Sequence, residues 1–169
     1  PMRGFRRMAC ALLLLLLTAA TLAAQPVDMV VLLDTSTSML PYYEDLVEYL
    51  IRGILRDYLR YGDTFHLIAF AGDSTAEVIQ EMATTQDIEA VLRHILLIHP
   101  LGPYTDLVRA FRFLHAYVRR LPSDSQKTIL VMTDGRHEPP PGSEYDLDAD
   151  AVRSELFETA RTIRREGWE

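Results

Sequence analysis

The sequence contains one cysteine, Cys10, among its 169 residues. A single cysteine cannot form an intramolecular disulfide, so the stability of the fold must come from its apolar core. Basic residues are also in short supply, with 17 Lys and Arg against 24 Asp and Glu. The resulting formal net charge of −7 disfavours binding to nucleic acids and to anionic lipids, which are themselves negatively charged. No pair of histidines has the spacing of zinc ligands, so core or surface roles are favoured for them.

Residues 1–24 differ in composition from the rest of the chain. Three arginines precede an unbroken apolar stretch, and small residues follow it before Gln25. This arrangement predicts a secretory signal peptide that is cleaved after Ala23 or Ala24. The alternative is an uncleaved membrane anchor, but residues 8–24 provide a stretch of only 17 residues, at the short limit for crossing a bilayer.

Cleavage of this peptide would change the composition of the mature chain. Cys10 lies ahead of the apolar stretch and would be removed with it. The mature chain would then have no cysteine, and its 14 basic and 24 acidic residues would give a net charge of −10. We therefore expect an exported protein that is periplasmic, on the cell surface or secreted. Membrane attachment is expected only through the uncleaved anchor.

Beyond the predicted signal peptide, strand-like apolar runs alternate with helical patterns. The apolar fraction of the whole chain, 49%, is enough for the core of one domain. Four strands are expected, at residues 29–34, 65–70, 76–80 and 127–133. Four helices are expected, at residues 41–62, 85–95, 105–121 and, after a proline-rich loop, 152–163. This order predicts one α/β domain over residues 25–169, with a doubly wound, mostly parallel sheet and helices on both faces.

Two of the expected strands deliver an aspartate at their carboxyl ends. Asp34 opens into Ser36 and Ser38, Asp134 follows the last expected strand, and Thr105 begins an expected helix between them. Open α/β sheets place their ligands at the carboxyl ends of the strands. Two acids and three hydroxyls form an all-oxygen set suited to Mg²⁺, Mn²⁺ or Ca²⁺ and unsuited to soft metals. The sequence therefore predicts a hard-metal site at this edge.

Three segments resemble the three-part metal-ion-dependent adhesion site of von Willebrand factor type A domains: Asp34-x-Ser36-x-Ser38, Thr105 at the head of an apolar helix, and Thr133-Asp134-Gly135. The resemblance extends from residue 27 to about residue 168. It implies a Rossmann-like fold and a protein-binding domain without catalytic activity, acting in adhesion or complex assembly.

The resemblance also implies how the metal is held. The serines and the threonine contact the ion directly, Asp34 and Asp134 act largely through water, and a Glu or Asp of a protein partner completes the octahedron. Mg²⁺ or Mn²⁺ is the expected ion and Ca²⁺ fits less well, because Mg²⁺ takes about six oxygens and readily keeps waters. The alternative role for Ser36, Ser38 and Thr105 is helix capping.

The surroundings of the expected site add a candidate rim. The family usually has Gly-Gly-Thr where this chain has Gly102-Pro103-Tyr104-Thr105, so Pro103 stiffens the loop. Tyr104, His137 and Glu138 lie close to the expected ligands in sequence and are predicted to contact a partner. Exposed loop polarity explains His137 and Glu138 equally well.

Two other functions and one other metal site have partial support in the sequence. A phosphotransferase of the haloacid dehalogenase-like kind also begins with a strand ending in Asp, but it needs a second Asp where this chain has Ser36. A structural subunit that has lost its metal is the third possibility. The acidic run Asp146, Asp148 and Asp150 could hold a Ca²⁺-type ion, but a charged first turn of a helix is favoured.

The last residues of the sequence also carry a prediction. Members of the resembled family continue past the final helix with at least one more strand and helix. Gly167-Trp168-Glu169 has the pattern expected at the start of such a strand. We therefore expect an incomplete domain that lacks its last strand or strands.

Overall fold

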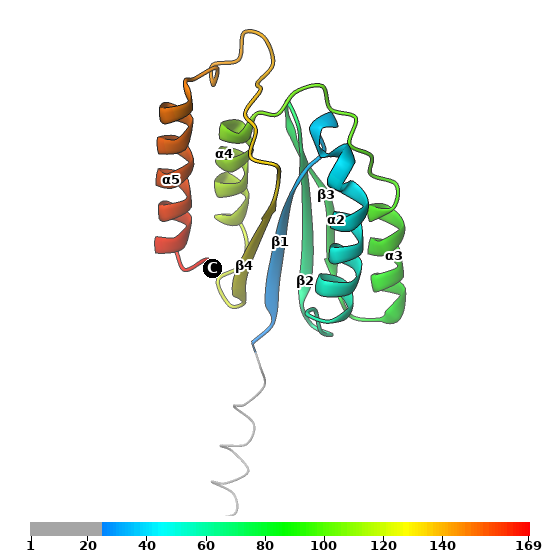
Figure 1. The fold of residues 1–169 in the computed structure, drawn as a ribbon. Helices are drawn as coiled ribbons and strands as arrows, with labels where there is room; N and C mark the ends of the chain where they lie inside the picture. The colour runs from blue at the N-terminus through cyan, green and yellow to red at the C-terminus, as the bar shows by residue number, and fades with distance from the viewer. Residues whose placement is uncertain (1–24) are drawn as a thin grey trace, which may run out of the picture.

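The computed structural model describes residues 25–169, and the predicted signal peptide lies outside the described residues. Four strands form one sheet in the order β3-β2-β1-β4 (Figure 1). The strands are β1 (Val27–Asp34), β2 (Thr64–Phe70), β3 (Ser74–Glu81) and β4 (Gln126–Met132). Strand β1 is parallel to both β2 and β4, whereas β3 is antiparallel to β2. The predicted mostly parallel sheet is therefore confirmed, with β3 as the expected edge strand.

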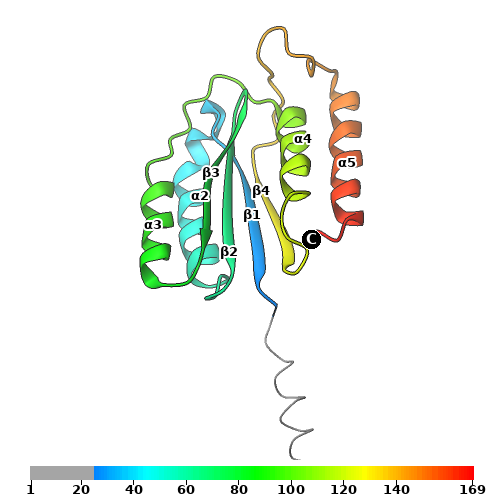
Figure 2. The same cartoon turned by 180° about the vertical axis from the view of Figure 1, so that it is seen from behind.

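Helices cover both faces of this sheet, as the alternation of elements predicted. They are η1 (Thr37–Tyr42), α2 (Tyr43–Tyr49), η2 (Leu50–Arg56), α3 (Thr85–Ile95), α4 (Leu107–Val118) and α5 (Ala149–Arg165). Helices α2 and α3 lie on one face, and α4 and α5 lie on the other (Figures 1 and 2). Among the helices of residues 25–169, none combines the length and the apolar character needed to span a membrane.

Strand β1 supplies the centre of both core layers. Val31 and Leu33 pack toward α2 and α3, whereas Val30 and Leu32 pack toward α4 and α5, and all four side chains are fully buried. Burying one such side chain stabilises the fold by about 1.5–3 kcal/mol. A strand buried on both faces has no polar alternation, which is why its sequence is a continuous apolar run.

The segment predicted as one helix over residues 41–62 is divided into three parts and ends earlier. A 3₁₀ turn contains Pro41, a short α-helix follows, and a π-helical segment ends at Arg56. In a π-helix, whose hydrogen bonds join residues five apart, residues four and five apart lie on the same face, so Leu50, Ile54 and Leu55 all face the core. Sequence periodicity alone could not distinguish this arrangement from a regular α-helix.

One of the two next helices begins where it was predicted, and the other begins later. Helix α3 begins at residue 85 as expected, and the backbone N–H of its N-cap, Thr84, donates to Asp87 Oδ2 at 2.7 Å. Helix α4 begins at Leu107, two residues later than expected, with Asp106 as its N-cap. This difference is within the usual uncertainty of helix ends.

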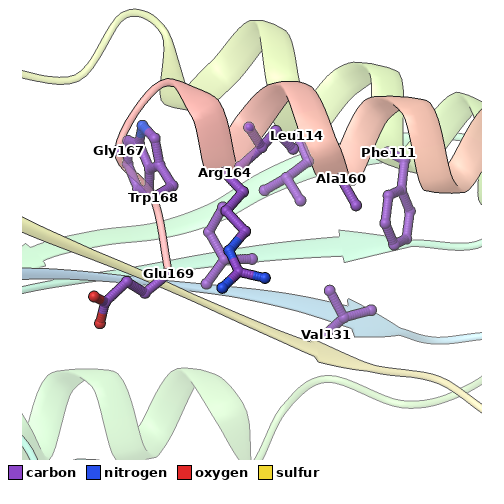
Figure 3. A pocket seen from close by; sticks show the side chains of 10 residues that line it. Phe111, Leu114, Val131, Ala160, Arg164, Gly167, Trp168 and Glu169 are labelled. Carbon is purple, nitrogen blue, oxygen red and sulfur yellow. The ribbon is translucent and has the colours of Figure 1, made fainter.

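The outer edge of β4 borders an apolar groove. Glu169 pairs with this edge, because its N–H donates to Lys127 O at 3.1 Å and its carbonyl accepts from Ile129 N at 2.7 Å. Figure 3 shows the groove between β4 and helices α4 and α5, with a volume of about 640 Å³. Its lining includes Phe111, Leu114, Val131, Ile163 and Trp168. Glu169 thus has the strand-like pairing that its sequence pattern predicted, while a further strand stays a prediction.

A buried polar cluster lies at the opposite end of the sheet from the candidate site. Asp28 Oδ2 accepts hydrogen bonds from Lys127 Nζ at 2.6 Å and from the Ser125 hydroxyl at 2.5 Å. His66 Nε2 lies 3.5 Å from Asp28 Oδ1, and His66 Nδ1 lies 2.8 Å from the Tyr117 hydroxyl oxygen. Asp28, His66 and Lys127 are all buried. The cluster therefore joins β1, β2, α4 and β4 through mutually compensating groups.

This environment lowers the pKa of both Asp28 and His66. Burial alone would raise the pKa of Asp28, but the hydrogen bonds from Lys127 and Ser125 and the charge of Lys127 lower it below its usual value. Burial lowers the pKa of His66, and the neighbouring Asp28 offsets this only in part. Both groups consequently bind protons more readily in the unfolded chain than in the folded one.

We predict that the free energy of unfolding falls as the pH is lowered below about 6.5, first through His66 and then, near pH 4, through Asp28. Above that range both groups are in the protonation state that the fold favours. Urea unfolding at pH 7.5 and pH 5.5 should show a smaller loss of stability in His66→Gln than in the wild type. The exposed His99 provides the control, because His99→Gln should retain the wild-type loss. Equal losses in the wild type and His66→Gln would contradict this assignment.

Candidate metal centre

Loops from four parts of the chain meet at the carboxyl end of the sheet, at the top of Figure 1. Backbone hydrogen bonds join them. Thr35 N donates to Phe70 O at 2.8 Å, and Gly102 N donates to Thr35 O at 3.0 Å. Asp106 N donates to Ala71 O at 2.8 Å. The loops after β1 and β2 and the loop before α4 therefore form one connected unit.

Gly102 permits the close approach of these loops. A Cβ atom at this position would lie 2.3 Å from the Cβ of Ala71 and 3.2 Å from the carbonyl oxygen of Thr35. Real Cβ contacts are not that short, so a side chain here would push the loops apart. The glycine is needed for space and not for an unusual backbone angle, since its φ is not positive.

Asp34 lies at the centre of the site and is completely buried. Its Oδ1 accepts from Ser36 N at 2.9 Å, and its Oδ2 accepts from the Thr133 hydroxyl at 2.7 Å. Among the ion pairs of the described residues, none involves Asp34, whereas Asp134 pairs with Arg136. A buried carboxylate is costly unless it is paired, so a bound cation at this place would offset the cost.

Ser36 and Ser38 present their hydroxyls side by side, with 3.1 Å between the two Oγ atoms. Neighbouring oxygens around an ion with ligands at about 2.1 Å in an octahedron are separated by about 3 Å. The spacing therefore fits two adjacent positions of a Mg²⁺ site. Ser36 is the N-cap residue of η1, but its side chain makes no capping hydrogen bond. The capping alternative is thus wrong for Ser36.

Thr105 is fixed as an extended residue, so the prediction that it heads a helix is wrong. Its N–H donates to Glu138 O and its carbonyl accepts from Glu138 N, both at 2.8 Å. The helix that follows is capped by Asp106, whose Oδ1 accepts from Arg109 N at 3.0 Å. Capping is therefore not the role of Thr105, which is 2% exposed.

Asp134 follows β4 and faces its neighbour Arg136. Its side chain is 11% exposed, its Oδ1 accepts from Arg136 N at 3.0 Å, and its Oδ2 lies 3.5 Å from Arg136 Nε. Within residues 25–169, no group of three or more His, Cys, Asp and Glu side chains is arranged to hold a metal. A metal at this edge must therefore take part of its ligands from hydroxyl groups.

The structure brings the five predicted ligands to one edge of the sheet, three of them in one loop and two in neighbouring segments. Asp34, Ser36 and Ser38 belong to one loop and are directly joined by hydrogen bonds. Asp134 is connected to them through the bond from Thr133 to Asp34. Thr105 belongs to the loop that pairs with Ser36 at Gly102 and with the β4 loop at Glu138. Metal ligation by this set stays a prediction that the geometry favours.

The predicted rim residues occupy different environments. Tyr104 is 37% exposed and Glu138 is exposed, so both are accessible to a partner. His137 is partly buried and both of its ring nitrogens are engaged: Nδ1 accepts from Leu107 N at 3.2 Å, and Nε2 donates to Tyr145 O at 2.7 Å. His137 therefore attaches the β4 loop to the start of α4. Partner contacts by these three residues stay predictions.

Asp148 and Asp150 of the acidic run form the start of α5, as favoured, whereas Asp146 lies before the helix. Asp148 is the N-cap of α5, and its Oδ1 accepts from Asp150 N at 3.0 Å and from Ala151 N at 2.9 Å. Asp150 lies in the first turn, where a negative charge interacts favourably with the helix dipole.

The sequence did not show the roles of four residues that shape the site: Gly102, Asp106, Thr133 and Arg136. Asp106 had a local signal, because an aspartate directly before an apolar helical pattern is a common N-cap. Thr133 was visible as a hydroxyl beside Asp134, but its partner lies 99 residues earlier in the sequence. The role of Gly102 had no local signal, since it depends on loops that meet only in the fold. Arg136 lies two residues after Asp134, but no motif indicated its contact with that carboxylate.

Comparison with known proteins identifies the same region. The family model described as the von Willebrand factor type A domain matches residues 29–137, which include all five predicted ligands. No curated protein sequence matches the chain.

Solved structures share the fold at low sequence identity. Proximal thread matrix protein 1 from the mussel byssus, with a zinc occupied MIDAS motif, has a TM-score of 0.62 and 16% identity, over 86% of this chain and 37% of that one. BatB from Bacteroides thetaiotaomicron has a TM-score of 0.59 and 22% identity, over 85% of this chain and 63% of that one. The pilus adhesin SpaC from Lactobacillus rhamnosus GG has a TM-score of 0.54 and 18% identity, over 68% of this chain and 16% of that one. The chain spans less than two thirds of each of these proteins.

We predict that Gly102→Ala destabilises the fold by about 1–3 kcal/mol, the usual cost of an added methyl in a packed site. Urea unfolding measures the effect. The double variant Ala71→Gly/Gly102→Ala is the matched control, because it removes the methyl group at 2.3 Å and should recover much of the loss. Wild-type stability in Gly102→Ala would show that the loops are not packed as described.

Proposed function

This chain belongs to the von Willebrand factor type A domain family, and from that membership we propose that it binds a protein partner through a divalent metal ion at the carboxyl edge of β1 and β4. Domains of this family typically bind protein ligands and are usually not catalytic. The proposed ligands are Asp34, Ser36, Ser38, Thr105 and Asp134. The observation that carries the proposal is the buried Asp34 carboxylate, which has hydrogen bonds from neutral donors only and no cationic partner among the described residues.

The chemistry of the donors favours Mg²⁺ or Mn²⁺. All five groups are hard oxygen donors, and soft metals prefer sulfur and nitrogen. Ca²⁺ takes six to eight oxygens at longer distances, whereas Mg²⁺ accepts a sparse protein set and keeps waters. The spacing of the Ser36 and Ser38 hydroxyls supports the smaller ion. A related structure contains zinc in its MIDAS motif, which shows that a relative of this fold takes up a divalent metal there.

The proposed site leaves a role for an acidic group of the partner. Two carboxylates, Asp34 and Asp134, balance the charge of one divalent ion, and the hydroxyls add none. The ion therefore keeps its attraction for a further carboxylate, and an Asp or Glu side chain of a protein supplies one. We propose a role in adhesion or complex assembly, performed outside the cytoplasm if residues 1–24 act as the predicted signal peptide. One similar structure is a pilus adhesin, which is consistent with such a role.

We predict that Mg²⁺ binds the folded chain and raises its free energy of unfolding by about 2.7 kcal/mol when free Mg²⁺ is a hundredfold above its dissociation constant. Ser38→Ala should greatly weaken this binding, because it removes one direct ligand. Ser123→Ala, an exposed hydroxyl in the loop before β4, should leave it unchanged. Isothermal titration calorimetry measures both affinities. Equal Mg²⁺ affinity in Ser38→Ala and the wild type would rule out the assigned ligands.

We further predict that partner binding depends on the metal. A partner isolated from the envelope of the source organism should be released by a chelator and bind again when Mg²⁺ is restored. Thr105→Ala should weaken this binding strongly while costing only about 1 kcal/mol of stability, the typical cost of a substitution, because the backbone pairing with Glu138 stays intact. Thr85→Ala, at the exposed start of α3, is the control and should bind normally. Full-strength binding in excess chelator would exclude a bridging metal.

A further inference from the structure

Arg136 is the one residue that forms an ion pair with a candidate ligand among the described residues. Its two contacts with Asp134 are of different kinds. The backbone N–H donates to Oδ1 at 3.0 Å, and the side-chain Nε lies 3.5 Å from Oδ2. The backbone contact orients the Asp134 carboxylate whatever the side chain does. The guanidinium is therefore not needed to hold Asp134 in place.

The segment after β4 places Arg136 beside Asp134. Gly135, between the two, has a φ of +79°, which favours glycine. Gly135 N donates to the Thr133 hydroxyl at 3.1 Å, and Thr133 in turn donates to Asp34. The backbone of Arg136 is thus fixed to the same network as the candidate ligands.

The guanidinium itself is loosely held. The Arg136 side chain is 65% exposed, and its ion pair uses one of five N–H donors at a long distance. Exposed pairs of this kind are weak, so the guanidinium can leave Asp134 at little cost. Arginine also matches the planar shape of a carboxylate and can donate two parallel hydrogen bonds to it.

The charges around the proposed site indicate when the Arg136 guanidinium would leave Asp134. A divalent ion beside Asp34 and Asp134 makes a neutral group, and a carboxylate from a partner adds one negative charge. The positive charge of Arg136 would balance it. In contrast, Arg136 and the ion carry charges of the same sign and compete for Asp134.

We propose that Arg136 is a specificity-determining residue that pairs with Asp134 when no metal is bound and donates hydrogen bonds to the partner's carboxylate when the metal is bound. This inference rests on the proposed metal-dependent function. It has two consequences of opposite sign: Arg136 weakens the binding of the metal alone and strengthens the binding of a carboxylate to the metal-loaded chain. A merely structural role would affect both in the same direction.

The test uses the full chain with two probes, Mg²⁺ and acetate. Calorimetry gives the Mg²⁺ affinity, and NMR titration in saturating Mg²⁺ at constant ionic strength gives the acetate affinity. We expect Arg136→Gln to bind Mg²⁺ about three- to tenfold more tightly, because a nearby positive charge is removed. We expect the same variant to bind acetate about five- to tenfold more weakly, because a charge-assisted hydrogen bond is lost.

Two controls make the result specific. Arg136→Lys keeps the charge but loses the planar fork, so its Mg²⁺ affinity should stay near the wild-type value and its acetate affinity should be intermediate. Arg93→Gln removes an exposed arginine from α3 and should change neither affinity. Weakening of both probes in Arg136→Gln, or no change in either, would overturn the proposal. Mg²⁺ binding without acetate binding in the wild type would overturn it and leave the metal site standing, whereas absence of Mg²⁺ binding would overturn both.

Discussion

The buried carboxylate of Asp34 is the interaction on which the functional edge depends. It receives hydrogen bonds from its own loop through Ser36 and from the end of β4 through Thr133. The second bond joins segments that are 99 residues apart and holds them at the end of a strand with apolar layers on both faces. Since the carboxylate is completely buried, any displacement of either loop leaves a desolvated charge with fewer donors.

Each end of β1 carries a buried aspartate, and the negative charge is compensated differently at the two ends. Asp28 at the start of the strand is buried beside Lys127, which supplies a full positive charge and a hydrogen bond at 2.6 Å. Asp34 at the other end is buried more completely, yet its donors are neutral. One end is thus compensated within the chain and serves stability. The other is arranged so that a cation from solution would complete it, which is the physical basis of the proposed function.

Fold similarity and specificity have separate origins in this chain. The related structures share its architecture at 16–22% identity, so the fold tolerates replacement of most side chains. A metal bridged to one carboxylate distinguishes partners poorly, because every acidic protein surface offers that group. Selection among partners must therefore come from residues around the ion. The proposed contact of Arg136 strengthens the binding of the carboxylate itself, whereas Tyr104 and Glu138 are exposed close to Thr105 and extend the same surface.

The sequence by itself determined the class of fold, the strands and the identity of the candidate ligands. The run at residues 29–34 could be recognised because burial on both faces of a sheet requires an unbroken apolar segment, and that requirement is local. The three-part pattern at Asp34, Thr105 and Asp134 could be recognised because each part is a short motif at the end of an element. Local patterns of this kind can be recognised from the sequence alone.

Only the tertiary structure decided the features that depend on which segments meet. The pairing with Glu138 holds Thr105 in an extended conformation, so helix α4 begins at Leu107. The approach of Ala71 to Gly102 explains a glycine that has no unusual backbone angle. The hydrogen bond from the Thr133 hydroxyl to Asp34 brings the segment that carries Asp134 and Arg136 to the end of β1. Each of these contacts is set by the register of strands and loops distant in sequence, and no local pattern of residues encodes that register.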